Sequence, residues 1–244
     1  MASSFFYSSR AKVLWCCFVT AGRNCPIPGD IRSEVWLRLA FTSWHPICAA
    51  LGAPAHHGPS RPLETLRPNG ITNFYWEYFQ APGVAKAEFE RDVALSMRSV
   101  LGRVSSDPPA SMFIEAGKGF LAERKPGQSL PSWLTEEDLR VFAEAYRRSG
   151  FRGGLNWYRN IDRNWELTAP WQDAQIHQRS LFIAGAKDPV ITGLLRGKRL
   201  AEMKRVLPNL KEKLIIEGAG HWIQQERPEE VNAALIRFLK ETAG

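Results

Sequence analysis

The chain has no apolar run long enough to cross a membrane. Residues 13–21 are apolar, but they fall short of the roughly 18 residues that a spanning helix needs. This stretch follows Arg10 and Lys12, and no acidic residue precedes Asp30, so an N-terminal targeting segment stays open as an alternative. We expect a cytoplasmic protein without a membrane span.

Cysteines are few, and they do not form a metal site. The four are Cys16, Cys17, Cys25 and Cys48, and their spacing matches no paired zinc motif. The chain also lacks a phosphate-binding glycine loop, so no cofactor is expected. The net charge of +7 is not gathered on a basic helix face, which argues against a nucleic-acid partner.

A nucleophile elbow is missing as well. No predicted strand is followed by Gly-x-Ser-x-Gly, or by an aspartate or cysteine in an equivalent turn, anywhere before Asp188. Serine-dependent ester cleavage is therefore disfavoured.

The middle of the chain predicts helices. At 244 residues and 44% hydrophobic composition, the chain can bury one sizeable core. Apolar residues spaced four apart from Ala85 to Leu101 predict one helix. Thr135 is a good N-cap for a second helix, which Gly150 ends, and a third is expected over residues 155–167. This block of about a hundred residues contains no predicted strand.

The C-terminal part predicts alternating strands and helices. Strands are expected at residues 180–184 and 213–216, and helices at residues 200–206 and from Pro228 onward. This order indicates a parallel sheet. A helical block inserted before the last strands of such a sheet has the layout of a lid over an active site.

An acid and a histidine follow these two strands. Asp188 comes just after the first strand and His221 just after the second. In open parallel sheets, ligands lie at the carboxyl ends of the strands, and an acid followed by a histidine is typical of the later part of a catalytic triad. The alternative is that Asp188 is only a turn or helix cap.

Four motifs occur in order between about residue 62 and the C-terminus. They are Tyr-Trp-Glu-Tyr-Phe-Gln-Ala-Pro-Gly-Val-Ala at residues 75–85, Gly-Phe-Arg-Gly-Gly-Leu-Asn-Trp-Tyr-Arg-Asn at 150–160, Asp-Pro-Val at 188–190, and Gly-His-Trp-Ile-Gln-Gln-Glu-Arg-Pro at 220–228. This region resembles the soluble epoxide hydrolases, a family with the α/β-hydrolase fold. The resemblance implies that an aspartate attacks the epoxide carbon and that a histidine-activated water then cleaves the alkyl-enzyme ester, giving a vicinal diol.

The resemblance also implies roles for four residues. Tyr75 and Tyr158 match the lid tyrosines that donate hydrogen bonds to the epoxide oxygen, and a protonated phenol suits that role at neutral pH. His221 matches the general base, and Asp188 the carboxylate that orients it. The alternative for the tyrosines is lid packing. Trp222 could line the pocket or simply pack, and we leave it outside the predicted site.

The front of the α/β-hydrolase fold cannot fit before the predicted lid. Each strand-helix unit needs about 20–25 residues, so five units need more than about 100. Fewer than 50 residues precede Ile47. We predict an incomplete α/β-hydrolase fold whose N-terminal strands are largely missing. Residues 1–45 would be an atypical segment, disordered or misframed, residues 46–61 and 176–244 a remnant core, and residues 62–175 the lid.

Two functions stay open at this point. The first is an epoxide hydrolase that is active only if a nucleophile is supplied. The second is an inactive lid-and-pocket remnant that binds epoxides or lipid-like small molecules. A related chemistry such as dehalogenation is disfavoured by the tyrosine pair.

Overall fold

The computed structural model describes residues 60–66, 73–105, 112–122, 129–192 and 203–242. Helices come first along this part of the chain: α4 (Pro62–Leu66), α5 (Tyr75–Tyr78), α6 (Val84–Arg91), α7 (Val93–Arg103), α8 (Glu136–Ser149), α9 (Arg152–Arg159), α10 (Ile161–Thr168) and the 3-10 turn η2 (Ala169–Trp171). The remaining elements are β1 (Ser180–Gly185), α11 (Pro189–Thr192), β2 (Leu210–Ile216), α13 (Ile223–Glu226) and α14 (Pro228–Thr242). Residues 203–206 form a further helical turn.

Several predictions from the sequence lie outside the described residues. These are the four cysteines, the apolar residues 13–21, the atypical segment 1–45, nearly all of residues 46–61, and the absence of most N-terminal strands. None of the helices in the described ranges is long and apolar enough to cross a bilayer.

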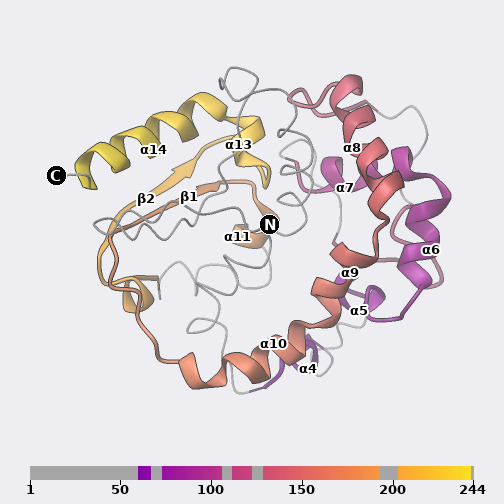
Figure 1. The fold of residues 1–244 in the computed structure, drawn as a ribbon, viewed down its shortest axis with the longest axis horizontal. Coiled ribbons are helices and arrows are strands. Elements are labelled where there is room, and N and C mark those ends of the chain that lie inside the picture. Colours follow the sequence, from indigo (N-terminus) through magenta and orange to yellow (C-terminus); the bar gives the residue numbers. More distant parts are fainter. Residues whose placement is uncertain (1–59, 67–72, 106–111, 123–128, 193–202, 243–244) are drawn as a thin grey trace, which may run out of the picture.

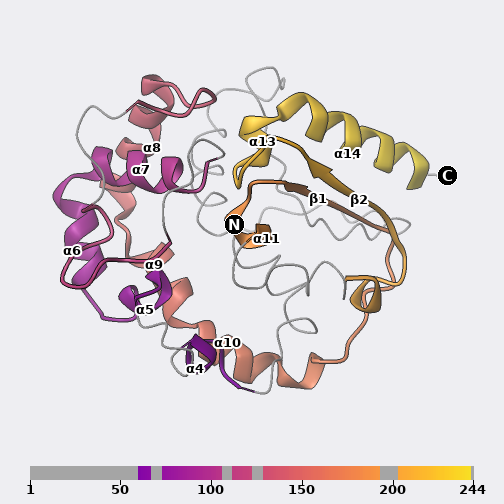
Figure 2. The same ribbon diagram turned by 180° about the vertical axis from the view of Figure 1, so that it is seen from behind.

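The helical block and the strands occupy different parts of the molecule. Figures 1 and 2 show α5 to α9 on one side, β1, β2 and α14 on the other, and α13 near the boundary between them. Where residues 60–171 are described, they contain helices and no strand, apart from one isolated bridge between Phe74 and Phe113. This is the arrangement expected of a lid, although the exact domain division stays a prediction.

The predicted ends of α8 are confirmed. The Thr135 side chain accepts a hydrogen bond from the Asp138 backbone, and the Asp138 carboxylate accepts one from the Thr135 backbone. This capping box satisfies two amides that the first turn leaves without helical partners. Gly150 ends the helix at φ 67°, a conformation that favours glycine.

The prediction of a single helix from Ala85 to Leu101 is wrong, because the helix is interrupted at Asp92. Asp92 is extended (φ −143°, ψ 96°), and its carboxylate accepts a hydrogen bond from Leu95 N at 2.9 Å. An aspartate that caps the next helix stabilises the break. The spacing of four continues across it, so Phe89 on α6 and Met97 on α7 still enter one core.

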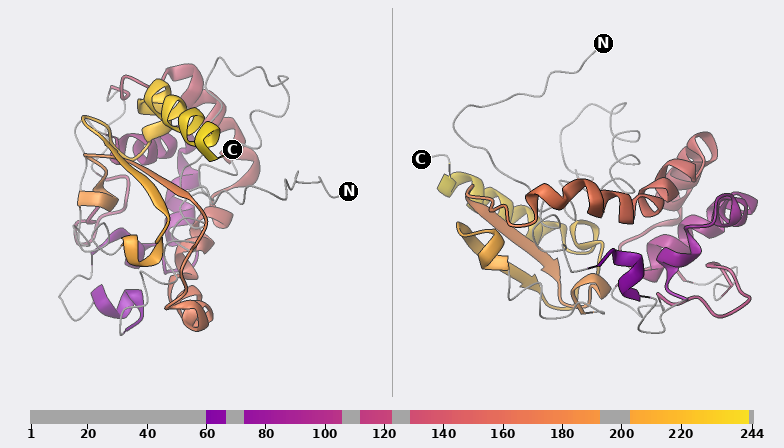
Figure 3. Two further views of the ribbon diagram at one scale, coloured as in Figure 1. Left: turned by 90° about the vertical axis from the view of Figure 1, so that its left-hand side faces the viewer. Right: turned by 90° about the horizontal axis from the view of Figure 1, so that it is seen from below.

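The predicted third helix is also divided. Asn160 separates α9 from α10, and its backbone amide bonds back to Asn156 O. In Figure 3, α4 lies beside α10. The Asp162 carboxylate of α10 accepts a hydrogen bond from Leu63 N, and this contact joins the two helices.

Strands β1 and β2 form the parallel pair that the order of elements predicted. Residues 181–185 of β1 pair in continuous register with residues 212–216 of β2. Every residue of β1 is buried. Leu181 and Ile183 pack toward α14, whereas Phe182 and Ala184 pack toward Met203 and the turn around it. Alternate side chains of β1 therefore enter two different cores, as expected for a strand covered on both faces.

The core of the helical block reaches the C-terminal part through one residue. Trp222 lies in the same buried cluster as Tyr75, Phe79, Met97 and Leu101. Its indole N–H donates a hydrogen bond to Leu101 O at 2.8 Å. The loop after β2 is thereby attached to the end of α7.

Candidate active site

Asp188 lies three residues beyond the end of β1, in a tight turn. Its backbone N–H bonds to Gly185 O, and its Oδ1 accepts a hydrogen bond from Val190 N at 2.8 Å. The side chain therefore caps the start of α11, as the turn-or-cap alternative expected. Asp188 is buried, and its carboxylate also contacts the loop that follows β2.

His221 lies in that second loop, which is fixed from two sides. Its backbone N–H donates to Val104 O at 3.0 Å, just beyond α7. The buried carboxylate of Glu226 accepts hydrogen bonds from the amides on either side of the histidine, Gly220 N at 2.7 Å and Trp222 N at 3.2 Å. Bonds to a carboxylate are among the stronger ones in proteins, so they hold the histidine backbone in place.

The two loops bring Asp188 and His221 into contact. His221 Nδ1 lies 3.0 Å from Asp188 Oδ2 and 3.1 Å from Oδ1. Both side chains are mostly buried, at 15% and 11% exposure. An imidazole that donates its Nδ1 proton to a carboxylate keeps Nε2 as a proton acceptor. The arrangement therefore suits general-base chemistry.

The close approach of the loops depends on a small residue. Ala186 N bonds to Ile216 O, and Lys187 N bonds to Ala219 O. A Cβ atom at Gly185 would overlap the carbonyl oxygens of Ala219 and Gly220. Glycine at the end of β1 therefore lets the histidine loop approach the aspartate turn.

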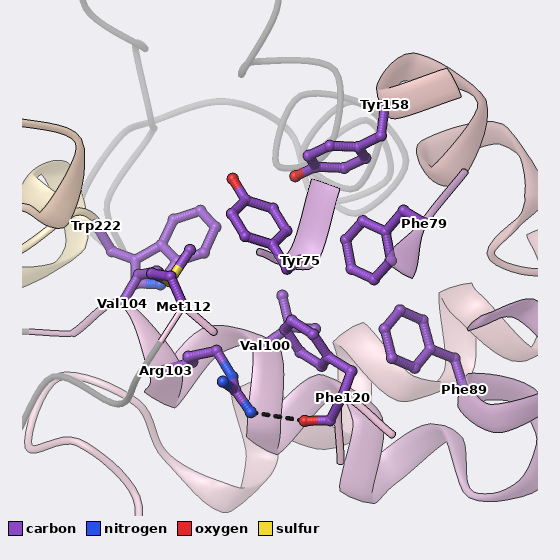
Figure 4. A pocket seen from close by; sticks show the side chains of 10 residues that line it. All are labelled: Tyr75, Phe79, Phe89, Val100, Arg103, Val104, Met112, Phe120, Tyr158 and Trp222. Carbon is purple, nitrogen blue, oxygen red and sulfur yellow. Dashed lines mark hydrogen bonds between the residues drawn. The ribbon is translucent and has the colours of Figure 1, made fainter. Parts of the chain in front are cut away.

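The two tyrosines singled out from the sequence also lie together. The ring centroids of Tyr75 on α5 and Tyr158 on α9 are 5.6 Å apart at 72°. Phe79 packs against both rings, with centroids 5.5 Å and 4.9 Å away. Figure 4 shows the two phenol oxygens close together at the same edge of the cavity. Two phenols so placed can donate hydrogen bonds to one oxygen atom.

These phenols border a cavity that opens to solvent. Its other walls are mainly aromatic and aliphatic side chains, with one guanidinium. They are Phe79, Phe89, Val100, Arg103, Val104, Met112, Phe120 and Trp222. The lining suits an apolar ligand with a single polar centre near the phenols.

Trp222 connects the two pairs of residues. It lines the cavity, and its ring centroid lies 5.1 Å from that of His221, although His221 itself does not line the cavity. The structure thus brings Asp188 to His221 and Tyr75 to Tyr158, and Trp222 lies between them. The site predicted from the sequence did not include Trp222, although this residue lines the cavity. Its position directly after the histidine was the sequence feature that could have indicated this.

Tyr146 on α8 is a third tyrosine near this site that the sequence did not point out. It is 5% exposed and stacks on Phe151 at 4.7 Å. Burial raises the pKa of Tyr146, and the nearby Tyr158 phenol adds to the rise. Its phenol is therefore neutral over the physiological range.

Among the described residues, no three His, Cys, Asp or Glu side chains gather to hold a metal ion.

A carboxylate and a histidine at the carboxyl ends of adjacent parallel strands, next to a helical block, resemble the later part of the α/β-hydrolase arrangement. Comparisons with known proteins narrow this resemblance. The chain is 44% identical over 197 residues to Epoxide hydrolase A of Mycobacterium tuberculosis, covering 78% of this chain and 60% of that protein. It is 38% identical over 217 residues to Epoxide hydrolase 1 of Siraitia grosvenorii, covering 88% of this chain and 64% of that protein. No protein-family model matches the chain.

A solved structure agrees with these relatives. The crystal structure of Epoxide Hydrolase A from Mycobacterium thermoresistibile matches with a TM-score of 0.67 and 44% identity, over 75% of this chain and 57% of that one. The chain is therefore a homologue of the epoxide hydrolase family, with about 40% identity over most of its length. It spans 60% and 64% of the length of the two curated relatives named above.

Proposed function

We propose that the chain carries the phenol and acid-base half of an epoxide hydrolase site, which converts epoxides to vicinal diols. In the first step a carboxylate attacks an epoxide carbon and the ring C–O bond breaks. Tyr75 and Tyr158 stabilise the oxygen that leaves, and one of them protonates it. In the second step His221, oriented by Asp188, removes a proton from water. The hydroxide cleaves the alkyl ester, which releases the diol and restores the carboxylate, and the proton taken up by His221 returns through solvent to the phenolate.

One observation carries this proposal: two phenols converge beside an apolar cavity whose wall, Trp222, adjoins the Asp188–His221 pair. A protonated phenol donates a hydrogen bond without competing as a nucleophile. A cavity with little water strengthens such donors when charge develops on the substrate oxygen. The arrangement thus supports ring opening better than ester hydrolysis.

The nucleophile is the part of this reaction that the sequence does not display in a recognisable elbow. The second candidate function follows from that gap. A cavity walled by aromatic side chains can bind epoxides or lipid-like molecules without turning them over. In this alternative the phenols hold the ligand oxygen and no ester forms.

Incubation with styrene oxide separates the two candidates. If a carboxylate supplied to the cavity acts as the nucleophile, we expect 1-phenylethane-1,2-diol as the product, detected by chromatography. We expect His221→Gln to lose the diol and to accumulate a covalent adduct, seen by intact mass, because the ester forms but no base activates water. His177→Gln is the matched control, since this imidazole is exposed and precedes β1, at the opposite end of that strand from Asp188. Binding of the epoxide without diol or adduct would support the second function.

A further inference from the structure

The loop that precedes α8 is fastened to α6 by one carboxylate. Glu88 on α6 accepts hydrogen bonds from the backbone amides of Phe120 at 3.1 Å and Leu121 at 3.0 Å. It also accepts one from the Tyr78 hydroxyl at 2.7 Å. Burial, followed by the hydrogen bond to Glu88, raises the pKa of Tyr78, so its phenol remains a donor. A Cβ atom at Gly119 would overlap Glu88 Oε1, so a side chain there would displace the carboxylate.

A second charged side chain holds Phe120 from another helix. Arg103, near the end of α7, is 2% exposed and donates a hydrogen bond to Phe120 O at 2.6 Å. Its guanidinium carbon also lies 4.2 Å from the centroid of the Phe120 ring. The amide, the carbonyl and the ring of Phe120 are therefore each contacted by a charged group. Charge-assisted bonds of this kind fix geometry more firmly than neutral ones.

The residue held in this way is a wall of the cavity. The Phe120 ring lies 5.4 Å from Phe79 and 5.4 Å from Phe89, tilted by 40° and 75°. Phe79 in turn contacts Tyr158, whose phenol borders the same cavity. Figure 4 shows Phe120 together with Phe79 and Phe89, with Trp222 across the cavity from Phe89. These three phenylalanines form an aromatic wall that continues to the phenol pair.

A wall of tilted rings favours one kind of substituent. Aromatic pairs prefer edge-to-face and offset arrangements, and they gain attraction beyond the area that they bury. A linear alkyl chain gains only the burial. An aryl group next to the epoxide can therefore exploit this wall, provided that the Phe120 ring keeps its position.

We propose that Phe120 is a specificity-determining residue that favours aryl over alkyl epoxides, and that Glu88 and Arg103 are the positioning residues that fix its ring. The inference rests on the proposed function, because it assigns a substrate class to the same cavity. The simpler alternative is that Glu88 only anchors the loop for stability. The two differ in one measurable respect: a stability role changes the affinity for all ligands alike.

The test measures binding and turnover separately. Dissociation constants for 1-phenylethane-1,2-diol and hexane-1,2-diol are obtained by calorimetric titration, and their ratio gives the aryl preference. Diol formation from styrene oxide and from 1,2-epoxyhexane is measured in parallel. We expect Phe120→Leu to lower the aryl preference about three- to tenfold, which is the size of one aromatic pair. Glu88→Gln is expected to lower it in the same direction.

The double variant provides the sharpest result. If Glu88 acts through Phe120, Glu88→Gln with Phe120→Leu has the same preference as Phe120→Leu alone, because coupled residues are not additive. Glu115→Gln is the control, since this exposed acid of the same loop pairs only at the surface with Lys118. Should Glu88→Gln not fold, Tyr78→Phe removes one of the three bonds to Glu88 and is expected to produce a smaller shift in the same direction.

An unchanged aryl preference in Phe120→Leu overturns the inference. So does a double variant in which the effects of the two single substitutions on the aryl preference multiply. Wild-type protein that binds the aryl diol preferentially but forms no diol from either epoxide refutes the proposed catalysis and leaves the inference standing. Wild-type protein that binds neither diol overturns both.

Discussion

The buried carboxylate of Glu226 provides the most exacting stability test of the His221 loop. Its two hydrogen bonds go to the amides of Gly220 and Trp222, which flank the histidine. In Glu226→Gln one oxygen remains an acceptor, whereas the new NH₂ group faces an amide that is itself a donor. One charge-assisted bond is lost and a buried N–H is left without its partner. This should cost about 2–3 kcal/mol of unfolding free energy.

For a chain of this size, that loss corresponds to a fall in Tm of about 4–12 °C. Thermal unfolding followed by circular dichroism or calorimetry measures it. Glu217→Gln is the matched control, because this carboxylate lies in the same loop but is exposed, and it is expected to shift Tm by about 1 °C or less. Equal Tm values for Glu226→Gln and wild type would refute the reasoning. So would an equal fall in the control.

Three further changes test other parts of the account. Gly185→Ala should destabilise the chain by about 1–3 kcal/mol in denaturant unfolding, because its Cβ overlaps the histidine loop, whereas Gly153→Ala in α9, which meets no atom within 4 Å, should stabilise it by about 0.5–1 kcal/mol. Equal effects would contradict the close approach. Trp222→Phe should lower the unfolding free energy by about 0.5–1.5 kcal/mol beyond the cost of the buried area that it loses, because the hydrogen bond to Leu101 O disappears. An unchanged unfolding free energy would contradict this contact. Tyr158→Phe should lower diol formation from styrene oxide at least tenfold, as measured by chromatography, with little change in Tm, and undiminished turnover would contradict its proposed role.

Features set by local sequence could be predicted well. Thr135 and Gly150 mark the ends of α8 because capping and left-handed glycine depend on neighbours in the chain. The strands were recognisable because β1 is a short apolar run covered on both faces. Since neighbouring parallel strands end at the same edge, the contact between Asp188 and His221 also followed from their positions after the strands.

Features that depend on contacts between distant segments could not be predicted. Periodicity alone does not reveal the break at Asp92, because apolar residues on α6 and α7 stay in phase across it. The role of Trp222 depends on the end of α7, which lies far away in sequence. Phe120 lines the cavity from a loop that contacts Glu88 and Arg103, which are distant in sequence, and no periodic pattern marks such a residue.

The central claim is that the two phenols and the Asp188–His221 pair serve one cavity. A crystal structure of the protein soaked with 1-phenylethane-1,2-diol tests it most directly. We predict that one diol oxygen lies within about 3.5 Å of both Tyr75 Oη and Tyr158 Oη, with the phenyl ring against the aromatic wall. A diol bound elsewhere, or bound in this cavity with both oxygens away from the phenols, would contradict the account.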